Sequence, residues 1–271
     1  MHADASVHAA ARIRCAAALA ILEGAHLVGA AMTGVSRFMN AEAGLEFERT
    51  VVENYFERLR GQAEQALAQF ESLARAAGVR SLEARLVADD AEGGLVMLSR
   101  FADLLVLGQS DPAHPVAAAA RDLPEYMVIN APRPVLLVPY AAGEYVRFDG
   151  KALVAWNGSL EAARALAHAL PLLHYASEVQ VVQFDPGESG ALQAQSADLC
   201  GWLGRHGIHA RVESRPGAVD AGNALLSLAA DQQAGLIVMG GYGHTRFREL
   251  ILGGATRTVL QSMTVPVLMA H

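Results

Sequence analysis

The sequence has few cysteines and no long apolar run, and each shortage excludes a class of protein. Its only two cysteines, Cys15 and Cys200, stand far apart and form no C-x-x-C pair. We therefore expect neither a disulfide scaffold nor a structural zinc site, and a reducing cytoplasm suits the chain best. No apolar run approaches the roughly 18 residues that a membrane-spanning helix needs. The sequence therefore predicts no such helix.

Positive charge is also in short supply. The 271 residues carry a formal net charge of -7 at pH 7, which argues against a nucleic-acid backbone or an anionic membrane as the main partner. Arg12 and Arg14 precede an apolar run, as in a signal peptide, but Glu23 and Gly24 interrupt that run early. We interpret the run as an amphipathic helix. Hydrophobic residues make up 52% of the chain and charged residues 18%, which is typical of a globular protein.

The chain contains an internal repeat. Two segments of the first half have counterparts in the second half at the same separation along the chain. The matched pairs are Ala102–Gly108 with Ala234–Gly240 and Pro134–Val138 with Pro266–Ala270. A third pair, Asp4–Ser6 and Asn157–Ser159, precedes an alanine-rich stretch in each half. The repeat predicts two fused domains of one design, residues 1–141 and residues 150–271.

The second half alternates between strand and helix patterns. Nearly continuous apolar strands are expected at Lys151–Trp156, Val179–Phe184, Ile208–Glu213, Leu236–Met239 and Val265–Met269. Helices are expected at Ser159–Leu173, Leu192–Arg205 and Val219–Ala230 and after Gly253. Such strands, joined by helices, predict an α/β fold whose parallel sheet is covered on both faces. Its ligands would bind beyond the carboxyl ends of the strands, where the strand order reverses.

The first half follows the same plan with two differences. Its second helix is long and charged, from about Ala43 to Ala77, and its opening strand is missing. The chain starts at Met1–Asp4, where such a strand would already be ending. Removing a central strand leaves the backbone groups of its neighbours unpaired, so we expect the natural chain to begin upstream of Met1.

Two glycine-rich segments of the second half carry the chemistry. Gly240-Gly-Tyr-Gly243 follows a buried strand, and Gly253-Gly-Ala-Thr256 opens a helix. Glycines at a strand exit let phosphates approach the backbone amides, and a helix N-terminus offers further amides at a positive dipole end. The two segments therefore predict a phosphate cradle, in which Arg246, Arg248 or Arg257 could neutralise charge.

These segments resemble the carboxyl-terminal signature of the universal stress protein family, G-x2-G-x9-G followed by a small residue, usually serine or threonine. Gly240, Gly243 and Gly253 match its three glycines. The segment Val154–Ser159 is similar to the family's first strand exit, which normally ends in Asp-x-Ser. Because both halves share the layout, the resemblance covers essentially the whole chain.

The resemblance implies two tandem, doubly wound parallel sheets of five strands in the order 3-2-1-4-5. ATP or a related nucleotide would lie across the ends of strands 1, 2 and 4. By residue matching, Ala155, Trp156 and Asn157 would flank the adenosine. Gln183 would present backbone groups to adenine, and Met239, Gly240 and Gly243 would hold the ribose and phosphates. The outer phosphates would be bound by Gly253, Gly254, Ala255 and Thr256.

Two residues depart from the family pattern. Asn157 replaces the usual aspartate, which removes a charge that could bind a metal ion or the ribose, and Gly254 replaces the usual serine or threonine. The first half keeps only the first glycine of the signature, in Gly108-Gln-Ser-Asp111, and Pro112 follows at once. We therefore expect the first half to bind nucleotide poorly or not at all, and to serve as a scaffold and pseudo-dimer partner.

Several residues that invite a catalytic interpretation have simpler ones. Ser159 lacks a G-x-S-x-G elbow and is expected to cap a helix. His206 and His209 have no carboxylate at a ligand spacing, and His244 is expected in a solvated loop. The sequence shows no P-loop lysine, no paired carboxylates and no nucleophile with a base. We therefore expect no metal site, no catalytic residues and at most weak ATP hydrolysis.

The sequence thus predicts a cytoplasmic regulatory protein of the stress response that binds ATP or AMP through its second half, with Mg²⁺ accompanying ATP. A ligand-free interaction module and a slow ATPase stay open as alternatives. An adenylating or pyrophosphatase-like enzyme would need a longer loop than Asn157–Ser159, and a dehydrogenase would need a glycine pattern that is missing before Asp185. The edge strands Val135–Val138 and Val265–Met269 are candidates for pairing the two halves, or two chains in a homodimer.

Overall fold

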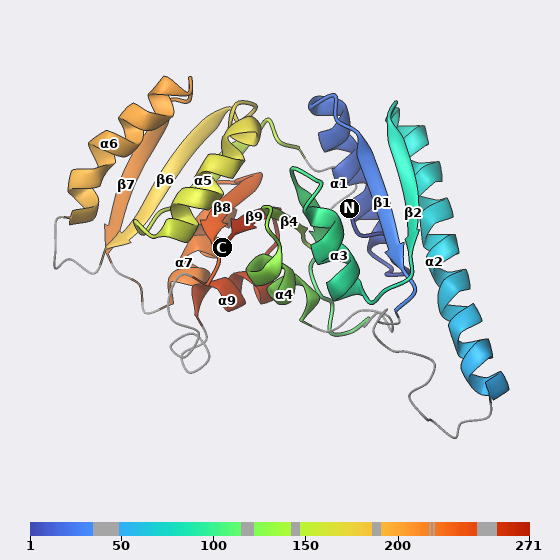
Figure 1. The fold of residues 1–271 in the computed structure, drawn as a ribbon. Coiled ribbons are helices and arrows are strands. Elements are labelled where there is room, and N and C mark those ends of the chain that lie inside the picture. Colours follow the sequence, from blue (N-terminus) through green and yellow to red (C-terminus); the bar gives the residue numbers. More distant parts are fainter. Residues whose placement is uncertain are drawn as a thin grey trace. The chain divides into compact units, whose positions relative to one another are not determined.

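The computed structural model describes residues 1–34, 49–114, 122–141, 147–185, 191–216, 218, 220–242 and 254–271. These residues form two compact units (Figure 1). Of the described residues, unit 1 contains 1–127 and 131–133, and unit 2 contains 128–130, 134–141 and 147–271. The division does not follow chain order strictly, because the segment 134–141 belongs to unit 2.

Unit 2 is built on a sheet with the strand order β4-β9-β8-β5-β6-β7. The strands are β4 (Val135–Val138), β5 (Lys151–Ala155), β6 (Glu178–Asp185), β7 (Ala210–Pro216), β8 (Leu236–Gly240) and β9 (Val267–Ala270). The five strands from β5 to β9 are all parallel to their neighbours. They lie in the order 3-2-1-4-5, which confirms the fold that the resemblance implied.

Helices α5 (Leu160–Leu173), α6 (Ala191–Arg205), α7 (Ala221–Asp231) and α9 (Ala255–Ser262) join these strands (Figure 1). The central strands are buried along nearly their whole length, and Leu153, Val181 and Ile237 are fully excluded from solvent. Helix α5 packs on β8 and β9 and buries Leu166. This is the core that nearly continuous apolar strands require, because a sheet covered on both faces has no polar side.

The start of α5 confirms a cap predicted from the sequence. The Oγ atom of Ser159 accepts a hydrogen bond from the backbone N–H of Ala162 at 3.2 Å. Glu161 lies in the first turn, where the helix dipole favours an acidic side chain. Ser159 therefore has a structural role at this position, as expected.

The sheet of unit 2 has one strand more than the five expected. Strand β4 pairs with β9 in the antiparallel direction, with Val135 opposite Met269 and Leu137 opposite Val267. All four residues of β4 are buried. The two segments that the sequence identified as edge strands therefore pair with each other within unit 2.

Unit 1 contains strands β1 (Leu27–Met32), β2 (Leu82–Val87) and β3 (Leu105–Gly108) and helices α1 (Ala9–Leu22), α2 (Arg49–Ala77) and α3 (Ala91–Ser99), and it is followed by α4 (Leu123–Asn130). Strands β1 and β2 are parallel. Helix α2 packs on both and buries Phe70 completely. A Cβ atom on Gly29 would lie 2.6 Å from Cγ of Phe70, so this close approach of α2 to β1 requires glycine. Residues 43–48 of the predicted long helix lie outside the described residues.

No full strand precedes α1, as predicted, but the expectation that its neighbours lack partners is corrected. The backbone N–H of His2 donates to the carbonyl oxygen of Val106 in β3 at 3.1 Å. On the other side, Ala3 N–H donates to Ala30 O at 2.8 Å, and Ala30 N–H donates to Met1 O at 3.0 Å. Three residues thus bridge β1 and β3 at the level where the missing strand would end.

Two predictions about the chain as a whole can be compared with the structure. Within the part of the chain that the structure describes, no helix is long and apolar enough to cross a membrane. Both cysteines are free thiols, and Cys15 is buried in α1. Burial raises the pKa of Cys15 to about 12, so its thiol stays protonated and unreactive at neutral pH.

Candidate functional site

The strand order of unit 2 reverses direction between β5 and β8. From β5 the chain proceeds outward to β6 and β7 and then returns to β8 on the other side of β5. Helices that follow β5 and β8 consequently leave the sheet on opposite faces and open a crevice at the carboxyl edge. The candidate site residues of the second half all belong to the ends of these strands or to the helix that precedes β9.

The exit of β8 and the start of α9 are joined by one hydrogen bond. The backbone N–H of Tyr242 donates to the Oγ1 atom of Thr256 at 3.2 Å. Thr256 is only 3% exposed, and Tyr242 adopts a left-handed backbone conformation with φ 57°, which is uncommon for a residue with a side chain. The structure therefore brings together the described parts of the two glycine-rich segments, Gly240–Tyr242 and Gly254–Thr256.

Gly240 is required by the packing of helix α5 against the strand exit. A Cβ atom at this position would lie 2.6 Å from the backbone nitrogen of Ala162 and 2.7 Å from the carbonyl carbon of Glu161. Both are backbone atoms, which cannot move aside as a flexible side chain can. The first glycine of the signature therefore lets the first turn of α5 lie directly against the end of β8.

The start of α9 provides the donors of the site. Its N-cap residue, Gly254, makes no side-chain cap, and the first backbone N–H groups of a helix have no partners within that helix. The N–H groups of Gly241 and Tyr242 are used inside the protein, because Gly241 N–H donates to Ala270 O at 2.9 Å. An anion held here would therefore bind at the α9 terminus, with Arg257 exposed on the same turn.

Asn157 follows β5 and is exposed. Its Oδ1 atom accepts a hydrogen bond from Ser159 N–H at 3.1 Å. A carboxylate would accept the same bond, so asparagine preserves the turn while removing the charge. The residue that departs from the family pattern therefore keeps its structural role.

Trp156 precedes Asn157 and continues the sheet by one bond, from its N–H to Val182 O at 2.9 Å. Its indole Nε1 atom is buried and meets no acceptor among the described residues. Buried polar groups normally have a partner. The indole N–H at the end of β5 is thus a donor that a bound acceptor could satisfy.

Gln183 and Met239 point their side chains into the core. Gln183 is fully buried in β6, and its Oε1 atom accepts hydrogen bonds from Ser196 Oγ in α6 at 3.3 Å and from Ser214 Oγ in β7 at 3.1 Å. Met239 is 6% exposed and lies opposite Met269. Only backbone atoms of these two residues can therefore reach a ligand at the strand ends, whereas Ala155 is half-buried.

Several predicted residues lie outside the described residues. They are Gly243 and Gly253 of the glycine signature, together with His244, Arg246 and Arg248. The described residues on either side, Tyr242 and Gly254, are the ones that the hydrogen bond to Thr256 brings together. The roles assigned to the five outlying residues stay predictions.

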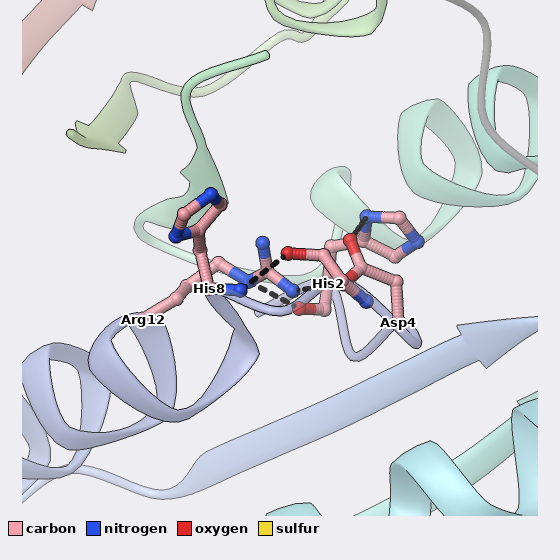
Figure 2. Close-up of polar contacts among 5 residues, drawn as sticks. His2, Asp4, His8 and Arg12 are labelled. Carbon is pink, nitrogen blue, oxygen red and sulfur yellow. Dashed lines mark hydrogen bonds and ion pairs between the residues drawn. The ribbon is translucent and has the colours of Figure 1, made fainter. Parts of the chain in front are cut away.

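Unit 1 fills the corresponding place with its own side chains (Figure 2). Asp4 Oδ1 accepts a hydrogen bond from Ser6 N–H at 2.9 Å, which repeats the turn of Asn157 and Ser159. The same oxygen receives Arg12 Nη2 at 2.5 Å, and Arg12 Nε donates to His2 O at 3.0 Å. A Cβ atom on Gly108 would lie 2.5 Å from Arg12 Nη1. The guanidinium therefore occupies the space in front of the glycine that matches Gly240.

The Arg12 side chain determines the electrostatics of this cluster. Burial by itself would raise the pKa of Asp4, but the guanidinium of Arg12 outweighs burial and holds that pKa below its ordinary value. Burial also lowers the pKa of His2 to about 4. The sequence analysis noticed Arg12 only as a charge before an apolar run. Its spacing of two helical turns from Asp4 is the one sequence signal that could have suggested the pair.

Comparisons with known proteins agree with this architecture. Residues 150–271 match the model of the universal stress protein family. A universal stress protein from Archaeoglobus fulgidus DSM 4304 superimposes with a TM-score of 0.73 at 19% identity, over 99% of this chain and 96% of that one. A functionally unknown protein from Pseudomonas aeruginosa PAO1 does so with a TM-score of 0.53 at 15% identity, over 93% of this chain and 84% of that one. At such identities these likenesses show the fold alone. No curated protein matches the chain.

Proposed function

Because residues 150–271 are a universal stress protein domain, we propose that this domain binds an adenine nucleotide, ATP or AMP, across the carboxyl ends of β5, β6 and β8. The observation that carries the proposal is the hydrogen bond from Tyr242 N–H to Thr256 Oγ1 at 3.2 Å. It holds the end of β8 against the start of α9, where free helix amides favour an anion. A phosphate group fits this position by charge and by donor geometry.

The adenosine end of the nucleotide would lie over the end of β5. Trp156 offers a buried indole N–H without an acceptor among the described residues, and Ala155 is small and half-buried. The bonded turn of Asn157 and Ser159 presents a neutral amide rather than a carboxylate. We assign the base and the ribose to this side, with the backbone of Gln183 and Met239 completing it.

The phosphate end would lie between Gly240 and α9. Gly254, Ala255 and Thr256 supply the helix terminus, and Gly243 and Gly253 are assigned to the cradle by their match to the signature. Mg²⁺ would accompany ATP chiefly through phosphate oxygens and water, because Asn157 brings no negative charge for a hard cation.

Unit 1 is proposed to be a scaffold that binds no nucleotide. Its aspartate at the equivalent turn, Asp4, is neutralised by Arg12, and the Arg12 guanidinium stands in front of Gly108. A nucleotide phosphate would have to displace a buried ion pair to enter. The antiparallel pairing of β4 with β9 supports an intramolecular pseudo-dimer of the two halves, and homodimerisation would need another edge.

We propose a regulatory rather than a catalytic output. Among the described residues, the strand ends of unit 2 bring together no nucleophile with a base and no carboxylate pair, so hydrolysis of ATP would be slow. A stress-response role follows from the family of residues 150–271. Two free cysteines suit a reducing cytoplasm.

The test uses the full chain without a tag. Nucleotide that co-purifies under native conditions is identified by mass spectrometry, and ATP and AMP are titrated by calorimetry. The variant Gly254→Asp places a carboxylate at the N-cap of α9, a position that aspartate favours in helices, so the fold should be retained. We expect its affinity for ATP to fall by about tenfold or more, which is ~1.4 kcal/mol, because the added charge repels phosphate.

Matched variants at the same position separate charge from shape. Gly254→Asn caps the helix equally well without the charge and should bind ATP close to the wild-type affinity. Gly254→Ser restores the usual hydroxyl and should bind it at least as tightly. An unchanged affinity in Gly254→Asp would move the phosphates away from α9. A wild-type chain that binds neither ATP nor AMP would favour the ligand-free interaction module.

A further inference from the structure

Three side chains with metal-ligating atoms meet in unit 1, from segments far apart in the sequence. His8 precedes α1, whereas Asp111 and His114 follow β3. His8 Nε2 lies 2.8 Å from Asp111 Oδ2, and His114 Nδ1 lies 2.9 Å from the same oxygen. One ligand atom from each residue lies within 4.8 Å of the others. These distances gather two imidazole nitrogens around one carboxylate oxygen.

The carboxylate is held in place before any ligand arrives. Asp111 Oδ1 accepts a hydrogen bond from Ala113 N–H at 2.9 Å, and its side chain is 11% exposed. Hydrogen bonds from His8 and His114 hold the pKa of Asp111 below its ordinary value, so the group is a carboxylate at neutral pH. His8 is anchored through its backbone N–H, which donates to Ser6 Oγ at 3.0 Å.

The access and charge of the cluster suit a cation. The side chain of His8 is 27% exposed and that of His114 is 59% exposed, so an ion can reach them from solvent. The nearest arginine on α1, Arg12, is one turn from His8, and its charge is compensated by Asp4 at 2.5 Å (Figure 2). Asp111 thus contributes a negative charge that this arginine does not cancel.

We propose that His8, Asp111 and His114 form a binding site for a divalent transition-metal ion, best suited to Zn²⁺. Two imidazole nitrogens and one carboxylate oxygen are a ligand set that Zn²⁺ accepts, and three protein ligands leave a fourth position for water or an external ligand. Zinc–ligand bonds of about 2.0–2.2 Å place neighbouring ligand atoms about 3.3 Å apart. The side chains need only separate by about half an ångström, after which the ion replaces the hydrogen bonds that join them.

This inference is independent of the nucleotide proposal, because every ligand belongs to unit 1. It gives the first half a binding role of its own, at the strand ends where Arg12 blocks the place that corresponds to the phosphate cradle. The sequence analysis expected no metal ligands, since His8 and Asp111 are too far apart along the chain to suggest a motif.

The test is a titration of the tag-free, full-length chain after treatment with a chelator. Co²⁺ is added while its visible absorption is followed, and Zn²⁺ is then added in competition. We expect one equivalent of Co²⁺ to bind with the intense bands of a tetrahedral site, and Zn²⁺ to displace it. In His114→Ala, Zn²⁺ affinity should fall by at least about tenfold. The thermal unfolding temperature should rise with Zn²⁺ in the wild type and not in this variant.

Control variants make the result specific. His209→Ala removes an exposed histidine of unit 2 and should bind Zn²⁺ like the wild type, as should Gly254→Asp. Asp111→Asn keeps the hydrogen-bonding shape of the cluster without its charge and should also lose the ion, so the outcome does not depend on His114 alone. No binding by the wild type, or equal Zn²⁺ affinity in wild type and His114→Ala, would overturn the proposal and leave a plain ion-pair cluster.

Discussion

Arg12 donates a hydrogen bond from Nη2 to Oδ1 of Asp4 at 2.5 Å, and the arginine side chain is only 4% exposed. The pair joins the first turn after residues 1–3 to helix α1, and the guanidinium also bonds the backbone oxygen of His2. An ion pair so far removed from water is maintained by mutual compensation, because either charge alone would be costly to bury.

Breaking this pair should strongly destabilise unit 1. Arg12→Met retains the apolar stem of the side chain but leaves the carboxylate of Asp4 without its cation. We expect the free energy of unfolding to fall by about 3–5 kcal/mol, measured by urea denaturation. The double variant Arg12→Met with Asp4→Asn should regain a large part of that loss, because no buried charge remains. Equal stability of the single and double variants would show that the guanidinium acts by packing alone.

Burial of His2 should make stability depend on pH. Its pKa falls from 6.5 to about 4 on folding, so the unfolded chain takes up this proton more readily than the folded one. The contribution is complete above pH 6.5 and is lost as the pH falls from 6.5 to about 4, by about 3 kcal/mol in total. Denaturation across this range should therefore show a steeper loss of stability in the wild type than in His2→Gln. Parallel pH profiles for the two proteins would contradict the assignment.

A methyl group at Gly240 should disturb the contact between β8 and α5. In Gly240→Ala the new Cβ atom would lie 2.6 Å from the backbone nitrogen of Ala162, so the helix must shift. We expect a loss of about 1–3 kcal/mol in the free energy of unfolding. Gly204→Ala in α6 is the matched control, because nothing lies within 4 Å of its added Cβ atom, and it should stabilise the protein by ~0.5–1 kcal/mol. Similar effects at both positions would show that the end of β8 tolerates a side chain.

Asn157→Asp should restore a charge without disturbing the turn. The carboxylate can still accept the hydrogen bond from Ser159 N–H, as Asp4 does from Ser6 N–H in unit 1. We expect the melting temperature without ligand to stay close to that of the wild type. ATP binding measured by calorimetry should become more dependent on Mg²⁺, because a carboxylate beside the nucleotide repels phosphate unless a cation intervenes. Identical Mg²⁺ dependence in both proteins would place Asn157 away from the phosphates.

The architecture of unit 2 was predictable because its signals are local. Apolar runs ending in glycine located β8, and the serine before an alanine-rich stretch located the start of α5 at Leu160. One strand was misplaced by two residues: the run Ile208–Glu213 became β7 at Ala210–Pro216. The half-polar pattern of that strand is weak, because β7 lies at the edge of the sheet and exposes alternate side chains.

The contacts of unit 1 were less accessible to sequence reasoning. Whether Arg12 lies inside or outside cannot be known from a helix pattern alone, because the answer depends on Asp4 being there to receive it. The cluster of His8, Asp111 and His114 depends on two segments that only the sheet brings together. The side chain of Gln183, in turn, is directed to Ser196 and Ser214, a choice of sheet face that its place at the end of a strand did not reveal.

The pairing of β4 with β9 bears on where this protein can be divided. The matched family region begins at residue 150, yet β4 lies earlier in the chain and completes the sheet beyond it. A fragment cut at residue 150 would present the apolar backbone edge of Val267–Met269 to solvent. Such an edge recruits whatever strand is available, so the isolated fragment should associate with copies of itself, and adding back residues 134–141 should keep it monomeric.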